Sequence, residues 1–390
     1  MEIAFSKKQL KIAAILAVVL AVIAAIVIIN PFKSLPQNQG PDAAAGEEAS
    51  SKPKISFVSI TVPDCAECNA VEGLVASLKT LEVSIESEKT LAYDSAEAKE
   101  LIQKYSIEKV PALIISGETS KNKDLSEAWP QLGTVESDGA LVLRNIPPVY
   151  LDLKENIFKG RVSMIRLTDS ACVDCSETFS QGDFESAQVK IVSFDETDIS
   201  SADGKQLMEK YGLIKAPTVI LSKEIADYAV FEQLKTFGSI AEDGSLVFTS
   251  LVPPYHNLES NEVLGLIDAV FVVDSNCSEC ADVNTLIGIF TGSPSLPLKF
   301  GIVREVFSNS AEGKKLISQY SLNKLPSAVF SNDVYYYQPY FRIDEAWPSI
   351  GFIAEDNNYV FSKPEGLGVT YKDIESGEII FPEQPGEVIQ

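Results

Sequence analysis

The sequence predicts an α/β protein of three consecutive domains, each a central mixed sheet flanked by helices, preceded by one N-terminal transmembrane helix. Three observations lead to this prediction. All six cysteines form three Cys-x-x-Cys pairs, whose first cysteines lie 107 and then 105 residues apart. A prolyl dipeptide follows each pair, 46, 45 and 49 residues after its first cysteine. An unbroken run of 18 Ile, Ala, Leu and Val residues precedes all three repeats.

The apolar run covers Ile12 to Ile29, which is long enough to cross the hydrocarbon core of a bilayer as a helix. Lys7, Lys8 and Lys11 come just before it. By the positive-inside tendency, these lysines place residues 1–11 in the cytoplasm and the remainder of the chain outside it, at the cell surface or in a periplasm-like space.

A cleaved signal peptide is the alternative interpretation of this run. Its apolar region is usually shorter, and the nearest small-residue site, Ala43-Ala44-Ala45, lies well beyond the run. We therefore expect a single-pass signal anchor over residues 12–29, followed by a flexible linker over residues 30–53.

Composition restricts the partners of the chain. Hydrophobic residues make up 45% and charged residues 22%, which are globular values. The net charge is −23, from 55 acidic and 32 basic residues. Nucleic-acid binding rests on Lys and Arg that neutralise phosphates, so no nucleic-acid partner is expected.

The first repeat predicts its elements in chain order. Apolar and polar residues partly alternate from Ile55 to Val62, as in a strand, and apolar residues at helical spacing follow from 70 to 78. We therefore expect Cys65 and Cys68 at a strand-to-helix junction. The later elements are a short strand from Val83, a helix over Ser95–Tyr105 capped by Ser95, a buried strand over Ala112–Ser116 and a hairpin turned by Asp138-Gly139.

The second and third repeats follow the same course. Their helices are expected over Ser201–Tyr211 and Ser310–Tyr320, and their proline strands over Lys215–Ser222 and Lys324–Ser331. Trp129 and Trp347 occupy matching positions, with Leu234 between them in the second repeat, and we interpret them as core residues. The predicted domains are residues 54–157, 158–262 and 263–376, with a C-terminal tail over 377–390.

The order strand, Cys-x-x-Cys, helix, strand, helix, x-Pro, strand, hairpin resembles the thioredoxin fold, in three copies from Lys54 to about Ile374. The resemblance implies a cis peptide bond before Pro111, Pro217 and Pro326, with each proline packed beside its cysteine pair. It also implies that the residue before each proline (Val110, Ala216 and Leu325) offers backbone contacts to a bound peptide. Ala216-Pro217-Thr218 is the closest match to the usual tripeptide, and for this reason the second domain is expected to be the most active.

The repeats depart from the usual thioredoxin pattern at the cysteine pair. The usual pair encloses Gly-Pro and follows a Trp, whereas here the second enclosed residue is an acid and no aromatic residue precedes any pair. The acid that thioredoxins carry in the preceding strand has no evident counterpart, since Ser59, Arg166 and Phe271 stand six residues before the first cysteines.

The charges near each pair decide its chemistry, because the thiolate is the reactive species. A helix start favours the anion, whereas the enclosed acids Glu67, Asp174 and Glu279 oppose it. Lys109, Lys215 and Lys324, two residues before each proline, are candidates to compensate. We therefore expect thiol pKa values that are not much lowered, and a reducing or intermediate potential.

In this interpretation the exposed first cysteines, Cys65, Cys172 and Cys277, exchange with the substrate, and Cys68, Cys175 and Cys280 resolve the mixed disulfide. Inert structural disulfides are an alternative, since the environment outside the cytoplasm is oxidising. No metal and no cofactor are expected, because a zinc site needs two pairs within about 20 residues. His256, the one histidine, is interpreted as a linker residue on the surface.

The sequence thus predicts a membrane-anchored, extracytoplasmic thiol–disulfide oxidoreductase or isomerase. It would act on the disulfides of exported proteins and exchange electrons with a further redox partner. The alternative is a non-catalytic binding or scaffold protein of the cell envelope, which keeps the fold and uses its cysteine pairs as structural disulfides.

Overall fold

The computed structural model describes residues 52–68, 71–293 and 297–382. The anchor predicted over residues 12–29 lies outside these ranges. Within them, no helix has both the length and the apolar character that crossing a membrane requires.

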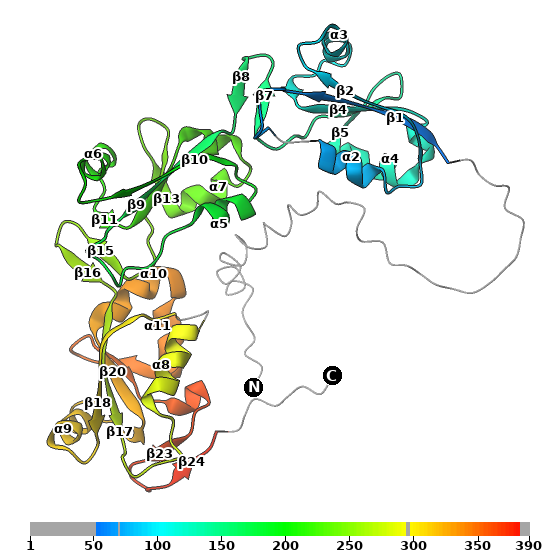
Figure 1. Ribbon diagram of the computed structural model, residues 1–390. Helices are drawn as coiled ribbons and strands as arrows, with labels where there is room; N and C mark the ends of the chain where they lie inside the picture. The colour runs from blue at the N-terminus through cyan, green and yellow to red at the C-terminus, as the bar shows by residue number, and fades with distance from the viewer. Residues whose placement is uncertain (1–51, 69–70, 294–296, 383–390) are drawn as a thin grey trace, which may run out of the picture.

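Three repeated units follow one another along the chain, each with a five-stranded mixed sheet (Figure 1). In the first unit the sheet order is β2-β1-β4-β6-β5, where β1 and β2 are parallel and β1 and β4 antiparallel. Its elements are β1 (Lys54–Thr61), α2 (Glu72–Leu78), β2 (Ser84–Ala92), α3 (Ala96–Lys104), β3 (Lys109–Val110), β4 (Ala112–Gly117), η1 (Thr119–Lys121), α4 (Lys123–Leu132), β5 (Gly133–Val135), β6 (Leu141–Leu143), β7 (Tyr150–Asp152) and β8 (Ile157–Lys159). The predicted α/β class and its repeated mixed sheets flanked by helices are confirmed.

The other two units repeat this topology with the sheet orders β10-β9-β12-β14-β13 and β18-β17-β20-β22-β21. The second unit contains β9 (Val162–Thr168), α5 (Gln181–Ser186), β10 (Ile191–Asp198), α6 (Ala202–Tyr211), β11 (Lys215–Ala216), β12 (Thr218–Leu221), η2 (Lys223–Asp227), α7 (Phe231–Leu234), η3 (Lys235–Phe237), β13 (Gly238–Ile240), β14 (Leu246–Phe248), β15 (Tyr255–Asn257) and β16 (Glu262–Leu264). The third contains β17 (Ile267–Val273), α8 (Val283–Gly292), β18 (Phe300–Phe307), α9 (Ala311–Gln319), β19 (Lys324–Leu325), β20 (Ser327–Phe330), η4 (Asn332–Tyr337), α10 (Gln338–Phe341), α11 (Ile343–Ala346), η5 (Trp347–Ser349), β21 (Gly351–Ile353), β22 (Tyr359–Phe361), η6 (Pro364–Leu367), β23 (Tyr371–Asp373) and β24 (Ile379–Ile380).

Helices cover both faces of the first sheet, α2 and α4 on one side and α3 on the other (Figure 1). Side chains alternate along β1, so Ile55 and Phe57 pack on the first face and Ile60 on the second. Trp129, on α4, is fully buried in this core. Trp347 and Leu234 are buried at the matching positions of the third and second units, so the predicted core role is confirmed.

The capped helices that the sequence predicted are present in all three units. The Oγ atoms of Ser95, Ser201 and Ser310 accept from the amide three residues on, at 3.2, 2.9 and 2.9 Å. The tyrosine at the end of each helix donates its hydroxyl to an aspartate of the hairpin turn, Tyr105 to Asp138 at 3.0 Å in the first unit. Lys104 also donates to this carboxylate and contributes most to holding the pKa of Asp138 at about 2.

Two features were not predicted. A helical segment separates the proline strand from the hairpin in every unit, as α4 does in the first. Each unit also carries a second, three-stranded sheet, in which a hairpin pairs with the two residues before the proline. These sheets are β3-β7-β8, β11-β15-β16 and β19-β23-β24.

The joints between units are held by the unit that follows. Gly160 donates its amide to Asp227 and accepts from the Tyr228 hydroxyl, both at 2.7 Å. Gly265 makes the same contacts with Asp333 and Tyr337, at 2.9 and 3.0 Å. Both glycines have positive φ, and a Cβ atom on them would lie 2.1 and 2.3 Å from a Pro148 or Pro253 carbon, so only glycine fits.

Candidate functional site

Each Cys-x-x-Cys pair forms a disulfide in the turn that leaves the central strand of its sheet. The Cα atoms of the three pairs lie 5.3, 5.4 and 5.5 Å apart. The amide of each first cysteine donates to the carbonyl three residues back, at 3.2 Å in Val62, 3.1 Å in Asp169 and 3.0 Å in Asp274. These bonds build the same β-turn in front of all three disulfides.

The expectation that the cysteines lie at a helix start is wrong. Helices α2, α5 and α8 begin at Glu72, Gln181 and Val283, which are seven, nine and six residues after the first cysteine of each unit. In the second and third units the cap decides this point, since Ser180 accepts from Asp183 N and Asp282 from Thr285 N. The first cysteines therefore receive no stabilisation from a helix dipole, and their amides are already used in turns.

The expected exposure of the cysteines is also wrong. Cys65, Cys172 and Cys277 are buried, with 7, 9 and 9% of their surface exposed. The second cysteines, Cys68, Cys175 and Cys280, are only partly buried. The turn directs the first sulfur of each pair toward the core and leaves the second nearer to solvent.

The prolines take the place that the resemblance implied. The bonds Val110-Pro111, Ala216-Pro217 and Leu325-Pro326 are cis, and the residue before each proline is buried. In the second unit Cys175 Sγ lies 3.9 Å from the Ala216 carbonyl oxygen, which brings the pair and the proline segment together.

The backbone before each proline is already paired within the chain. Val110 lies opposite Leu151 of β7, Ala216 opposite His256 of β15 and Leu325 opposite Lys372 of β23. A peptide that contacted this backbone in the predicted way would meet an edge that the hairpin occupies. The substrate-binding role of Val110, Pro111, Ala216, Pro217, Leu325 and Pro326 therefore stays a prediction.

The three sites differ in one pair of matched positions, the residue three before the first cysteine and the hairpin residue opposite the x-Pro segment. In the first unit these are Val62 and Leu151, both part of one buried apolar cluster. In the second they are Asp169 and His256, and in the third Asp274 and Lys372. The same backbone thus carries an apolar pair, an acid–imidazole pair and an acid–ammonium pair.

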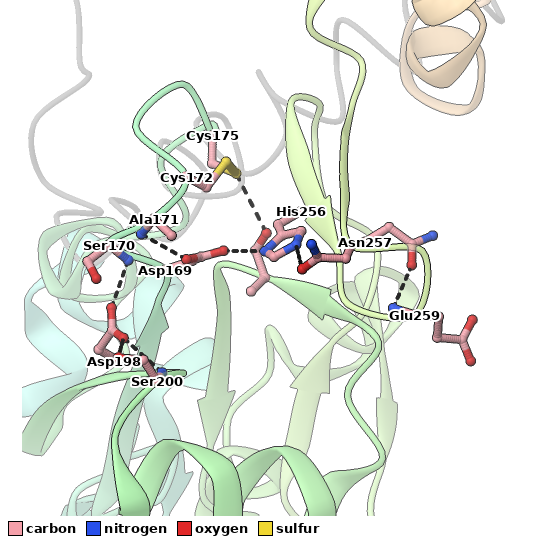
Figure 2. A network of polar contacts seen from close by, with 12 residues as sticks. Asp169, Ser170, Ala171, Cys172, Cys175, Asp198, Ser200, His256, Asn257 and Glu259 are labelled. Carbon is pink, nitrogen blue, oxygen red and sulfur yellow. Dashed lines mark hydrogen bonds and ion pairs between the residues drawn. A yellow bond between two sulfur atoms is a disulfide. The ribbon is translucent and has the colours of Figure 1, made fainter.

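The interpretation of His256 as a surface linker residue is wrong. It lies in β15 with its side chain 16% exposed, and its Nδ1 is 2.5 Å from the Asp169 carboxylate, which is 2% exposed. Its Nε2 lies 3.3 Å from Asn261 Oδ1. Figure 2 shows this chain of contacts beside the Cys172–Cys175 disulfide, with Asp169 also accepting from the Ala171 amide. Because 87 residues separate Asp169 from His256, no local pattern indicated the contact.

The third site has a lysine where the second has the histidine. Lys372 Nζ donates to Asp274 Oδ2 at 2.7 Å, and both side chains are largely buried. This hydrogen bond is the main reason that the pKa of Asp274 is held below its ordinary value. Asp274 also accepts from the Asn276 amide at 2.9 Å, as Asp169 does from Ala171.

The lysines expected to compensate the enclosed acids point elsewhere. Lys109, Lys215 and Lys324 lie over the rings of Tyr150, Tyr255 and Tyr371, with Nζ 4.5, 4.6 and 5.2 Å from the ring centres. Asp174 and Glu279 are exposed to solvent. Glu67, by contrast, is ion-paired at 2.5 Å with Arg161, a residue that the sequence did not single out.

No protein-family model matches the chain, and no curated protein matches it. Among solved structures it is similar to ERdj5, with 9% identity and a TM-score of 0.15 over 73% of this chain. The chain spans 38% of the length of ERdj5. Human ERp44 has 9% identity and a TM-score of 0.15, over 80% of this chain and 92% of its own. At these TM-scores the likeness carries no conclusion about activity.

Proposed function

We propose that this chain is a membrane-anchored, extracytoplasmic thiol–disulfide oxidoreductase with three redox sites at Cys65–Cys68, Cys172–Cys175 and Cys277–Cys280. The observation that carries the proposal is the triple recurrence of one disulfide in one place. Each disulfide leaves a central strand, and each has a partly exposed second sulfur.

A purely structural role accounts poorly for this recurrence. A disulfide that closes a loop of four residues restricts the unfolded chain little, by about 2 kcal/mol in the chain-entropy model, and less than the longer loops typical of structural disulfides. Each turn also has its own backbone hydrogen bonds, so it does not need a disulfide to close.

The burial of the sulfurs sets the direction of exchange. A substrate thiolate attacks the accessible second cysteine, the bond to the first cysteine breaks, and its electron pair goes to the first sulfur, which becomes a thiolate. The second thiolate of the substrate then attacks the mixed disulfide. The substrate leaves as a disulfide and the pair as a dithiol, so two electrons pass from substrate to protein. The reverse sequence reduces a substrate disulfide.

The substrates and location belong to this proposal as well. The run over residues 12–29 supports an anchor, and the lysines before it support a chain whose three units face away from the cytoplasm. Exported proteins with thiols or disulfides are then the substrates, and a further thiol–disulfide protein is the redox partner. Deleting residues 12–29 tests the anchor, because the truncated chain should leave the membrane fraction.

A second candidate function is a cell-envelope scaffold with inert disulfides. The hairpins favour it, since they occupy the backbone edge beside each x-Pro segment, and so does the burial of the first cysteines. In this case the row of units would serve as a binding surface.

One experiment separates the two candidates. The full chain, in detergent micelles, is equilibrated in glutathione buffers, and each pair is followed by mass spectrometry of alkylated peptides. If at least one pair titrates reversibly in the folded protein, the oxidoreductase is supported and its potential gives the direction of electron flow. If all three pairs resist reduction until guanidinium unfolds the chain, as bonds below about −300 mV do, the scaffold is supported.

A further inference from the structure

The first disulfide has a cation beside it that the other two lack at the matching position. Arg161 Nη2 lies 3.8 Å from Cys65 Sγ and 2.5 Å from a Glu67 carboxylate oxygen. Its guanidinium stacks on the Phe158 ring, 3.7 Å from the ring centre. Its Nε is buried and has no hydrogen-bond partner among the described residues, so the group has donor capacity to spare.

Arg161 reaches the first site from the joint to the second unit. It follows Gly160, whose backbone is held by Asp227 and Tyr228 of the second unit, and it directly precedes β9. The side chain thus starts from a point that the second unit anchors and ends at the disulfide of the first. Leu266 stands at the matching place after Gly265, so the second disulfide receives no such charge.

We propose that Arg161 is a positioning residue of the first redox site, which stabilises the thiolate of Cys65 and so makes this pair the most oxidising and most readily reduced of the three. The inference rests on the proposed function and specifies which site accepts electrons first. It replaces the sequence-based expectation that the second domain is the most active.

The chemistry follows from the charge balance at the sulfur. When a substrate thiolate attacks Cys68, the Cys65–Cys68 bond breaks and its electron pair goes to Cys65 Sγ, beside the guanidinium. A cation within a few ångströms favours the charged form of a thiol, and the burial of Cys65 limits screening by water. Stabilising the thiolate stabilises the reduced pair, which raises its potential. Glu67 opposes this effect, because its carboxylate neutralises part of the Arg161 charge.

The test compares the three pairs inside one molecule. The full chain in micelles is reduced with dithiothreitol and desalted, and the rate of iodoacetamide alkylation of each cysteine is followed against pH by peptide mass spectrometry. Arg161→Gln should slow Cys65 alkylation at pH 7 about tenfold and leave Cys172 and Cys277 unchanged. Arg161→Lys should restore part of the rate. Arg166→Gln, which removes an exposed charge of β9 that is paired with Glu196, is the matched control and should change none of the three rates.

Glu67→Gln separates an electrostatic role from a structural one. If Arg161 acts on the sulfur, freeing it from Glu67 speeds Cys65 alkylation. If Arg161 matters only through its ion pair with Glu67, this variant slows alkylation as Arg161→Gln does, and the proposal is overturned. An unchanged Cys65 rate in Arg161→Gln also overturns it.

The alkylation test requires only reduced protein, so its outcome is independent of whether the pairs exchange with glutathione. A chain whose pairs resist glutathione but whose Cys65 rate depends on Arg161 would lose the proposed function and keep this inference. In glutathione buffers, Arg161→Gln should move the equilibrium of the Cys65–Cys68 pair about tenfold toward the disulfide.

Discussion

The first and second redox sites share a backbone and differ in charge. In both, a turn after the central strand carries the disulfide, and a hairpin pairs with the residue before a cis proline. Beneath the first disulfide lie Val62 and Leu151, and a guanidinium approaches its buried sulfur. Beneath the second lie Asp169 and His256, and a leucine replaces the arginine.

This difference shows that the fold and the electrostatics of the site are set by different residues. The turn and the sheets depend on backbone hydrogen bonds and on small or apolar residues that recur in every unit. The charges come from three positions on the edge of this framework. Repeats with one architecture can therefore differ in redox behaviour, and the third site, with Asp274 and Lys372, is a further variant.

The largest expected effect comes from breaking the acid–imidazole pair. Asp169→Ala leaves His256 and the Ala171 amide without their acceptor in a buried setting, which should cost the second unit about 3 kcal/mol of unfolding free energy. Hydrogen exchange of peptides from 162–264 in increasing denaturant measures this value. Asp174→Ala, which removes an exposed acid four residues from the turn's first carbonyl group or nearer, should change it by less than about 0.5 kcal/mol. Equal effects of the two variants would contradict the assigned role of the buried pair.

The acid–ammonium pair of the third site should make its unit sensitive to acid. Since the folded-state pKa of Asp274 is lowered, its contribution to stability is complete above the ordinary value of about 4 and is lost as pH falls through the lowered value. Lys372→Met should therefore lower the unfolding free energy of the third unit by about 2 kcal/mol at pH 7, and the deficit should vanish in acid. Unit-resolved denaturation at several pH values measures it, with Lys315→Met on the exposed face of α9 as control. A deficit that persists at low pH would show that packing is responsible.

Transplanting the first pair into the second site should have a smaller effect. A buried charged pair replaced by apolar residues of similar size is often neutral, so Asp169→Val with His256→Leu should change the stability of the second unit by no more than about 1 kcal/mol. The variant also removes the one side chain type that ordinarily titrates between pH 5 and 8. The redox equilibrium of Cys172–Cys175 should then follow pH as that of Cys65–Cys68 does. A pH dependence unchanged from the native second site would mean that the pair does not influence its disulfide.

The smallest effect is expected from moving the cation. Leu266→Arg places a guanidinium at the second joint, but Val263 stands where Phe158 supports Arg161, and Asp174 is exposed. The new charge will be more mobile and better screened, so the Cys172–Cys175 equilibrium with glutathione should shift toward the dithiol by only about threefold. Peptide mass spectrometry in redox buffers measures the shift. A tenfold shift would show that Phe158 and Glu67 are not needed to position the arginine.

Much of the fold could be predicted from local pattern. Alternation identified β1 and β4, capping serines identified α3, α6 and α9, and Asp138-Gly139 identified the turn between β5 and β6. The late start of α5 and α8 could also have been read from their caps, Ser180 with Asp183 and Asp282 with Thr285. The hairpins at β7, β15 and β23 were missed because their strands are only three residues long and show no alternation of their own.

By itself, the sequence determined the three repeats, the α/β class, the cysteine pairs and the prolines in step with them, because each depends on spacing or on propensities within a few residues. Only the tertiary structure decided which sulfur of each pair faces the core, that a hairpin covers the edge beside each proline, and which charges reach the disulfides. Arg161 lies 96 residues from Cys65 along the chain, and His256 lies 87 from Asp169. Contacts over such separations depend on how whole units pack, and no short-range pattern in the chain records them.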